Sequence, residues 1–227
     1  MRTYVLVHGA FAGGWMWREL ANDLRRRGHE VYTPTLTGLG ERVHLATPAT
    51  NLTTHIEDVL NVIRYEELND IVLAGFSYGG MVISGVADRI PDRIAHLVYI
   101  DAELPLDGEN EVEATGEEEW AKWDSIFVKE GWRTHMRIPG LSAEESARYE
   151  RLEGQPTASF EEPVRLQWPV EQQPFSRTFI AATDSAAPKS IARVRDHTGW
   201  RFFELPGGHS LHRDAPDQLA SLLHDLA

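Results

Sequence analysis

The sequence predicts an α/β protein built on an open, mainly parallel sheet of six strands with helices wound on both faces. Short, β-branched apolar runs alternate with longer segments of helical period, which is typical of a parallel sheet covered by crossover helices. The 227 residues are 42% hydrophobic, which suits one compact domain with a sizeable core. The apolar runs that we take as strands are 3–7, 30–33, 71–74, 95–100, 177–181 and 200–205.

The segments between the first strands have the spacing of helices. Segment 14–27 places Trp17, Leu20 and Leu24 at helical intervals and stops at Gly28, a residue type favoured just after a helix end. Further helices are expected at 53–65 and 78–90. The strands then follow the order 2-1-3-4-5-6, with each crossover made by a helix.

A long acidic segment interrupts this alternation between the fourth and fifth strands. It is too long for a bare loop and is expected to fold into short helices at 105–175. We therefore expect one domain overall, with a core formed by 1–104 and 176–227 and an insertion between the two parts.

Composition excludes several classes of function. Lys and Arg number 22 against 35 Asp and Glu, so the net charge of −13 repels phosphates, and neither nucleic acid nor a membrane is an expected partner. The absence of cysteine excludes disulfides, thiolate nucleophiles and Cys-ligated metals. No P-loop or H-E-x-x-H pattern is present, so no metal and no cofactor is expected.

The amino-terminal residues do not have the pattern of an export signal. Only Val5, Leu6 and Val7 precede His8, fewer than the apolar core of a signal peptide requires. No stretch reaches the length of apolar sequence that crosses a bilayer. A cytoplasmic location is therefore expected.

The most informative motif is Gly75-Phe76-Ser77-Tyr78-Gly79, which follows one predicted strand and opens a predicted helix. The pattern G-x-S-x-G in this context holds a serine on a tight turn, where glycine two positions to either side avoids a clash with the neighbouring backbone. Ser77 is therefore the candidate nucleophile.

A serine nucleophile needs a histidine base that is itself oriented by a carboxylate. His209 follows the last predicted strand, and Asp184 closes the strand before it. The chain order Ser77, Asp184, His209 is the order of the hydrolases that share this motif. His212 and Asp101 are the alternatives for base and acid, Asp101 because it also ends a predicted strand.

Acyl transfer also needs backbone N–H groups aimed at the developing oxyanion. The N–H of Tyr78 lies at the start of the helix that follows Ser77. The small-residue loop after the first strand should supply the second donor, with Ala10 as the candidate and Phe11 as the alternative. We also expect Phe11 to line the substrate pocket.

These motifs identify the chain as similar to the α/β-hydrolases, and within them to small esterases related to plant methyl-ester esterases and hydroxynitrile lyases. The resemblance rests on Val5-Leu6-Val7-His8-Gly9-Ala10, Trp15, the Ser77 motif with Gly80-Met81, Thr183-Asp184 and Gly208-His209, and covers about 3–107 and 177–227. It implies that the insertion is a helical cap, a lid over the site that supplies the acyl or alcohol pocket.

The resemblance also separates the two chemistries of this group. Its hydroxynitrile lyases carry threonine at the position of Gly9 and lysine at the position of Ser210. Without a lysine ammonium to stabilise a leaving cyanide, ester hydrolysis is favoured over cyanohydrin cleavage.

The expected function is therefore cofactor-free hydrolysis of a carboxylic ester of a small, largely apolar substrate through an acyl-enzyme. His209 takes the proton of Ser77, and Asp184 holds the imidazole in the required tautomer. A lactonase or biosynthetic cyclase with the same triad, and a noncatalytic receptor-like binding protein, are the alternatives. The sequence leaves a monomer and a homodimer open.

Overall fold

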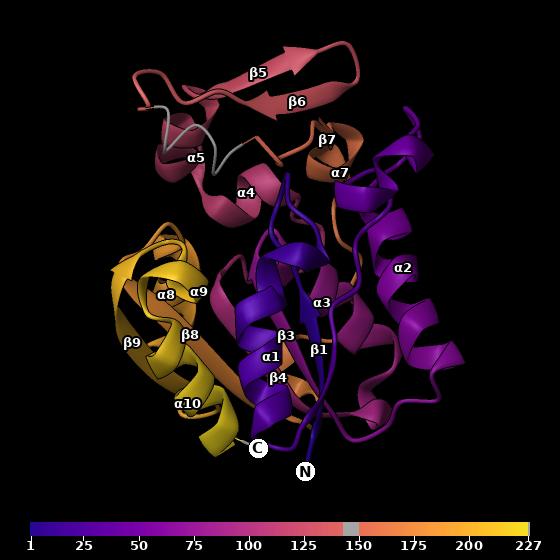
Figure 1. Cartoon of the computed structure of the whole chain (residues 1–227), viewed down its shortest axis with the longest axis vertical. Coiled ribbons are helices and arrows are strands. Elements are labelled where there is room, and N and C mark those ends of the chain that lie inside the picture. Colours follow the sequence, from indigo (N-terminus) through magenta and orange to yellow (C-terminus); the bar gives the residue numbers. More distant parts are fainter. Residues whose placement is uncertain (143–149, 227) are drawn as a thin grey trace.

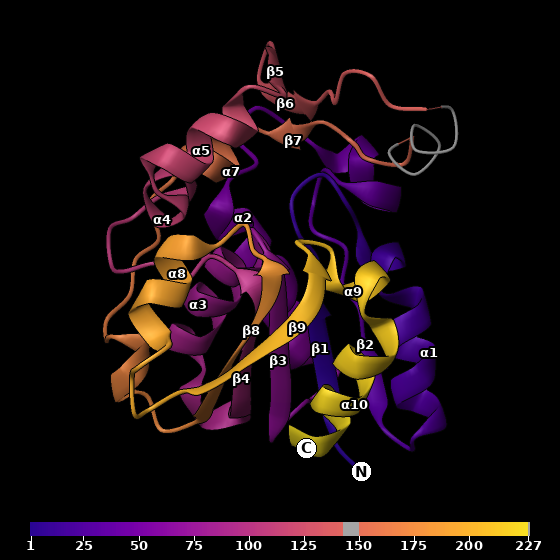
Figure 2. The same cartoon turned by 90° about the vertical axis from the view of Figure 1, so that its left-hand side faces the viewer.

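The computed structural model describes residues 1–142 and 150–226 and contains the predicted six-stranded sheet (Figures 1 and 2). The strand order is β2-β1-β3-β4-β8-β9, and all neighbouring strands run parallel, which confirms the predicted topology. The strands are β1 (Thr3–Val7), β2 (Glu30–Tyr32), β3 (Ile71–Ser77), β4 (Ile94–Ala102), β8 (Ser176–Asp184) and β9 (Arg201–Gly208).

Helices cover both faces of the sheet, and each face has its own apolar core. The helices of the main body are α1 (Arg18–Arg26), α2 (Leu52–Tyr65), α3 (Gly79–Arg89), α8 (Pro188–Val194), α9 (Leu211–Asp214) and α10 (Pro216–Leu226). Figure 2 shows α1, α9 and α10 on one side of the sheet and α3 and α8 on the other. On the first side, Leu20 and Leu219 pack against the strands, and on the second side Val59 and Val82 do so. A residue such as Val5 faces one core while its neighbour Leu6 faces the other, as strand alternation requires.

Several strands extend beyond the apolar runs that predicted them, and the extra residues are the chemically informative ones. Strand β3 continues to Ser77, β4 to Ala102, β8 to Asp184 and β9 to Gly208. Because parallel strands end at the same edge, these residues lie together beneath the insertion. The site therefore forms at the carboxyl edge of the sheet.

The insertion is a lid that contains helices, as expected, and also a small antiparallel sheet that the sequence did not predict. Its helices are α4 (Glu111–Thr115), α5 (Glu117–Asp124) and α7 (Ala158–Glu161), and its strands are β5 (Phe127–Glu130), β6 (Arg133–Met136) and β7 (Gln155–Pro156). Most of β5 is exposed, so the strand has no alternating apolar pattern to reveal it. Part of the predicted cap, 143–149, lies outside the described residues.

Ion pairs and hydrogen bonds attach the lid to the main body on two sides. Arg193 and Lys189 of α8 contact the Glu109 carboxylate at 2.7 and 2.9 Å. On the other side, Glu162 accepts hydrogen bonds from the backbone N–H and the hydroxyl of Thr53 at the start of α2. The lid is thus held above the sheet edge (Figure 1). Among the described residues, no helix is both long and apolar enough to cross a membrane.

Candidate active site

Ser77 lies on the sharp turn between β3 and α3. Its φ of +52° is in the left-handed region, which is unusual for a residue with a side chain. A Cβ at Gly75 would come within 2.6 Å of the Gly79 carbonyl oxygen, and one at Gly79 within 2.8 Å of the Val7 carbonyl oxygen. Both glycines are therefore required by close backbone approach, as the motif predicts, and the turn presents Ser77 to the pocket.

His209 follows β9 and is oriented by Asp101 rather than by Asp184. Its Nδ1 lies 2.7 Å from Oδ2 of Asp101, a carboxylate with no exposed surface. Because an Nδ1–H can serve one such acceptor, the prediction that Asp184 orients His209 is wrong. Asp184 pairs in the sheet with Gly208, next to His209, but its side chain is exposed. Asp101, the alternative acid, makes the contact to His209 that was predicted for Asp184.

Residues at the end of β8 and directly after it hold the Asp101 carboxylate in place. The backbone of Asp101 has a φ of +42°, which turns the chain near the end of β4. The backbone N–H groups of Ala182 and Ala186 donate to it at 3.0 and 3.1 Å, and the Ser185 hydroxyl donates at 2.5 Å. With His209, four donors surround the two oxygens, so each oxygen of this buried carboxylate accepts two hydrogen bonds.

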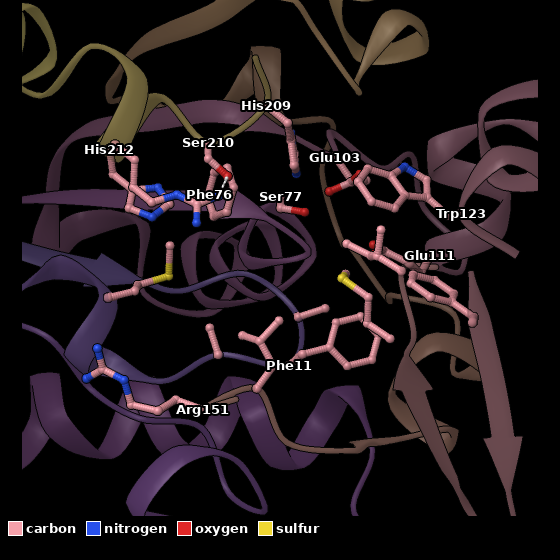
Figure 3. A pocket seen from close by; sticks show the side chains of 18 of the residues that line it. Phe11, Phe76, Ser77, Glu103, Glu111, Trp123, Arg151, His209, Ser210 and His212 are labelled. Atoms are coloured by element: carbon pink, nitrogen blue, oxygen red, sulfur yellow. Dashed lines mark hydrogen bonds between the residues drawn. The ribbon is translucent and has the colours of Figure 1, made fainter. Parts of the chain in front are cut away.

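The His209 ring lies between an aromatic side chain from the turn that carries Ser77 and one from the lid. Its ring centroid is 4.7 Å from that of Phe76 and 5.6 Å from that of Trp123, and its side chain is 19% exposed. Figure 3 shows this ring above the Ser77 hydroxyl. Within the described part of the chain, Ser77 makes no direct hydrogen bond to His209, whose Nδ1 is bonded to Asp101. In enzymes without bound substrate the contact between nucleophile and base is often long, and it shortens when substrate binds.

His212, the alternative base, packs against Phe76 and Trp17. Burial lowers the pKa of His212 to about 3, so the ring is neutral at physiological pH. It has no carboxylate partner among the described residues, and its Nδ1 has no hydrogen bond at all there. The arrangement favours His209 as the base.

The loop after β1 carries the predicted oxyanion donors. Buried His8 fixes its start, because Nδ1–H donates to the Gly9 carbonyl at 2.8 Å and Nε2 accepts from the Leu36 N–H at 3.0 Å. The Phe11 N–H donates to Oε1 of Gln155 at 3.0 Å. That bond occupies the N–H of the alternative candidate, whereas the first candidate, Ala10, lines the same pocket as Ser77.

Gln155 is a buried residue whose place near the site the sequence does not indicate. It lies in β7 of the lid with no exposed surface, and its Nε2 donates to Ser159 at 2.7 Å while Oε1 accepts from Phe11. One amide thus connects the lid to the oxyanion loop. No sequence signal marks it, because a single glutamine in an acidic insertion is usually solvated.

Ser77, His209 and Ala10 line a cavity of about 620 Å³ between the sheet edge and the lid (Figure 3). Its aromatic lining is Phe11, Trp15, Phe76, Trp120, Trp123, Phe127 and Phe160. Phe11 therefore contacts the pocket as predicted, although it is otherwise buried. The lid tryptophan Trp168 instead lies 59% exposed.

Two buried carboxyl groups also line this aromatic cavity. Glu103 follows β4 and is 3% exposed, and Glu111 begins α4 and is 4% exposed. Burial raises the pKa of Glu103 to about 7, and burial together with the charge of Glu103 raises the pKa of Glu111 well above its usual range. The sequence does not indicate that either carboxyl group lines the site, because both lie in a strongly acidic part of the chain.

Comparison with known proteins agrees with this architecture. A model of the alpha/beta hydrolase family matches residues 4–222. A "Carbendazim hydrolyzing esterase" from Nocardioides sp. (strain SG-4G) is 38% identical over 242 residues, covering 98% of both chains. "Putative methylesterase 14, chloroplastic" from Arabidopsis thaliana is 27% identical over 52% of this chain and 34% of its own length.

A solved structure has the same fold over its whole length. The methylesterase protein MES16 from Arabidopsis superimposes with a TM-score of 0.78 at 18% identity, covering 100% of this chain and 98% of that one. At this level of identity the likeness concerns the fold alone.

Proposed function

Because this chain belongs to the alpha/beta hydrolase family, we propose that it is a serine esterase that cleaves a carboxylic ester of a small, largely apolar substrate through an acyl-enzyme. The observation that carries the proposal is the arrangement at the sheet edge. Ser77 projects from a strained turn into an aromatic cavity, beside a histidine whose Nδ1 is fixed by a buried, fully hydrogen-bonded carboxylate.

In the proposed reaction His209 acts through Nε2. Asp101 accepts a hydrogen bond from Nδ1–H, which leaves Nε2 unprotonated and able to take the proton of Ser77 as Oγ attacks the ester carbonyl. The same proton then goes to the departing alcohol. Water, activated by His209, attacks the acyl-enzyme and releases the acid. Asp101 is a positioning residue that also stabilises the imidazolium.

The N–H groups of Ala10 and Tyr78 are the proposed oxyanion donors. Tyr78 lies at the N-terminal end of α3, where helix N–H groups have no partner within the helix and the dipole favours negative charge. Its hydroxyl bonds to Nδ1 of His55 at 2.8 Å, which fixes the residue from the far side. Donors of this kind contribute ~3 to 4 kcal/mol each to transition-state stabilisation.

The cavity and the relatives both support an ester of modest size. A volume of about 620 Å³ lined largely by aromatic rings suits one small aromatic or apolar group. The relative that aligns over 98% of both chains is named an esterase, and shorter matches are named methylesterases. These names support ester hydrolysis as the reaction class.

The surroundings of Gly9 disfavour a cyanohydrin lyase. A Cβ at this position would lie 2.9 Å from the Phe76 ring and 3.1 Å from the Ser77 Cβ. A threonine there, which the resemblance associates with lyases, would need Phe76 to move. Lactone opening by the same residues, or binding without turnover, would appear as different outcomes of the test below.

Burst kinetics with p-nitrophenyl acetate test the proposal. We expect release of about one p-nitrophenol per protein chain before the steady state, because p-nitrophenol is an activated leaving group and acylation should be faster than hydrolysis of the acyl-enzyme. Ser77→Ala should abolish both phases while leaving the circular dichroism spectrum unchanged. A folded wild-type protein that neither releases p-nitrophenol from this ester nor opens any of a panel of lactones would refute the proposal and favour a binding role.

A further inference from the structure

Two carboxyl groups in the cavity have oxygens without any partner. Oε2 of Glu103 and Oε2 of Glu111 are fully buried and make no hydrogen bond within the described part of the chain. A buried polar atom left unpaired costs about 1 to 3 kcal/mol, so such atoms usually have a function. Here two of them lie in one pocket, and the Ser77–His209–Asp101 mechanism uses neither.

The two groups come from different elements and are held rigidly. The Glu103 N–H donates to the Ser77 carbonyl at 3.4 Å, directly beside the nucleophile turn. A Cβ at Gly80 would come within 2.0 Å of the Glu103 carbonyl oxygen, so α3 packs directly on this backbone. Glu111 is the first residue of α4 in the lid. Figure 3 shows both carboxyl groups on the same side of Ser77, next to the Trp123 ring.

We propose that Glu103 and Glu111 form a recognition subsite for a planar, nitrogen-containing aromatic group of the substrate that carries N–H donors. The inference rests on the proposed esterase function, and it names the polar half of the substrate. Unpaired carboxyl oxygens require hydrogen-bond donors, and the neighbouring Trp123 and Phe127 rings provide flat apolar faces. A heteroaromatic amine supplies both in one group.

The electrostatics of the pair support this class of ligand. Burial raises the pKa of both groups, and the charge of Glu103 raises that of Glu111 further, so a protonated carboxyl is favoured and the pair can donate one O–H as well as accept N–H groups. An aminoheteroaromatic ring presents an N–H donor beside a ring-nitrogen acceptor, which complements such a pair. A purely hydrocarbon group would leave both oxygens buried without partners.

Direct binding of two matched compounds tests the subsite without any turnover. We compare 2-aminoquinoline with 2-methylquinoline, which has the same rings and no N–H donors, by titration calorimetry on the wild-type protein. The amino compound should bind at least tenfold more tightly. Glu103→Gln and Glu111→Gln should each reduce this preference to less than threefold, whereas Glu118→Gln, on the exposed surface of α5, should retain it.

The results that would overturn the subsite differ from those that would overturn the esterase. Equal affinity of wild type for the two compounds, or a preference that survives both glutamine variants, refutes the subsite even if p-nitrophenyl acetate is hydrolysed. If a glutamine variant fails to fold, a crystal structure of wild type with 2-aminoquinoline decides the matter. The amino nitrogen should lie within hydrogen-bond distance of a Glu103 or Glu111 oxygen, and any other placement refutes the proposal.

Discussion

The most informative substitution is Asp101→Asn, because it separates the observed partner of His209 from the one expected from chain order. Oδ2 of Asp101 accepts from His209 Nδ1 and from the Ala186 N–H, and Oδ1 accepts from Ala182 and Ser185. An amide that places its oxygen toward Ala182 must turn its NH2 toward His209. Nδ1 then has to accept a hydrogen bond, the proton moves to Nε2, and the ring can no longer take the proton of Ser77.

The structure sets the size of both effects. Loss of the correct tautomer should reduce kcat by roughly 10⁴-fold, equivalent to about 5 kcal/mol of transition-state stabilisation. The buried Ala186 N–H loses its acceptor in the same variant, which should lower the free energy of unfolding by about 1 to 3 kcal/mol. The opposite orientation of the amide would leave the Ala182 N–H unpaired instead.

Asp184→Asn is the matched control. Its side chain is exposed, so the unfolding free energy should change by no more than about 0.5 kcal/mol and the rate should stay close to that of wild type. Hydrolysis of p-nitrophenyl acetate and urea unfolding measure the two quantities. An Asp184→Asn variant that loses a hundredfold in kcat, or an Asp101→Asn variant that keeps a tenth of it, would refute the reasoning.

Three further changes test other parts of the site. Gln155→Leu removes the acceptor of the Phe11 N–H and should lower both kcat and, by about 1 to 3 kcal/mol, the free energy of unfolding; ester turnover and urea unfolding at the wild-type level would contradict this role. Gly79→Ala forces a Cβ against the Val7 carbonyl and should lower the unfolding free energy by about 1 to 3 kcal/mol together with kcat, and an unchanged melting temperature would count against the tight turn. Burial raises the pKa of Glu103 from 4.5 to about 7, so the folded protein holds this proton more tightly than the unfolded chain does. The resulting stabilisation of the folded state is present below about pH 4.5 and is lost as the pH rises through about 7. Between pH 4 and 8 the free energy of unfolding, measured with urea, should therefore fall by about 3 kcal/mol more in wild type than in Glu103→Gln. Parallel pH profiles for the two proteins would contradict the raised pKa.

The sequence predicts the sheet and the nucleophile because both depend on local patterns. The central strands β1, β3, β4 and β8 carry apolar runs with β-branched residues, because central strands of a parallel sheet are buried on both faces. The turn at Ser77 favours glycine at two fixed positions, because a Cβ at either would approach a backbone carbonyl oxygen too closely. His209 follows from its place after the last strand.

The acid could not be chosen in the same way, because Asp101 and Asp184 both end strands that meet at one edge. The choice depends on side-chain direction: a left-handed φ turns Asp101 inward, whereas Asp184 is exposed although its backbone lies next to Gly208. No local pattern encodes that difference.

The lid was predicted least well, and its functional residues were not predicted at all. Strand β5 is largely exposed, so it lacks the alternation by which strands are recognised. Gln155 and Glu111 are polar residues of the acidic insertion, and Glu103 lies just before it, in a part of the sequence where solvent exposure is the usual outcome. They are buried only because the lid packs on the sheet edge, a long-range contact that depends on the whole fold.

Covalent labelling is the most direct measurement of whether Ser77 is an activated nucleophile. After exposure of the wild-type protein to a fluorophosphonate, mass spectrometry of the digested chain should find a single phosphonylated residue, Ser77, and the label should be absent from Ser77→Ala. A folded protein that takes up no label, or takes it up on another residue, would contradict the account.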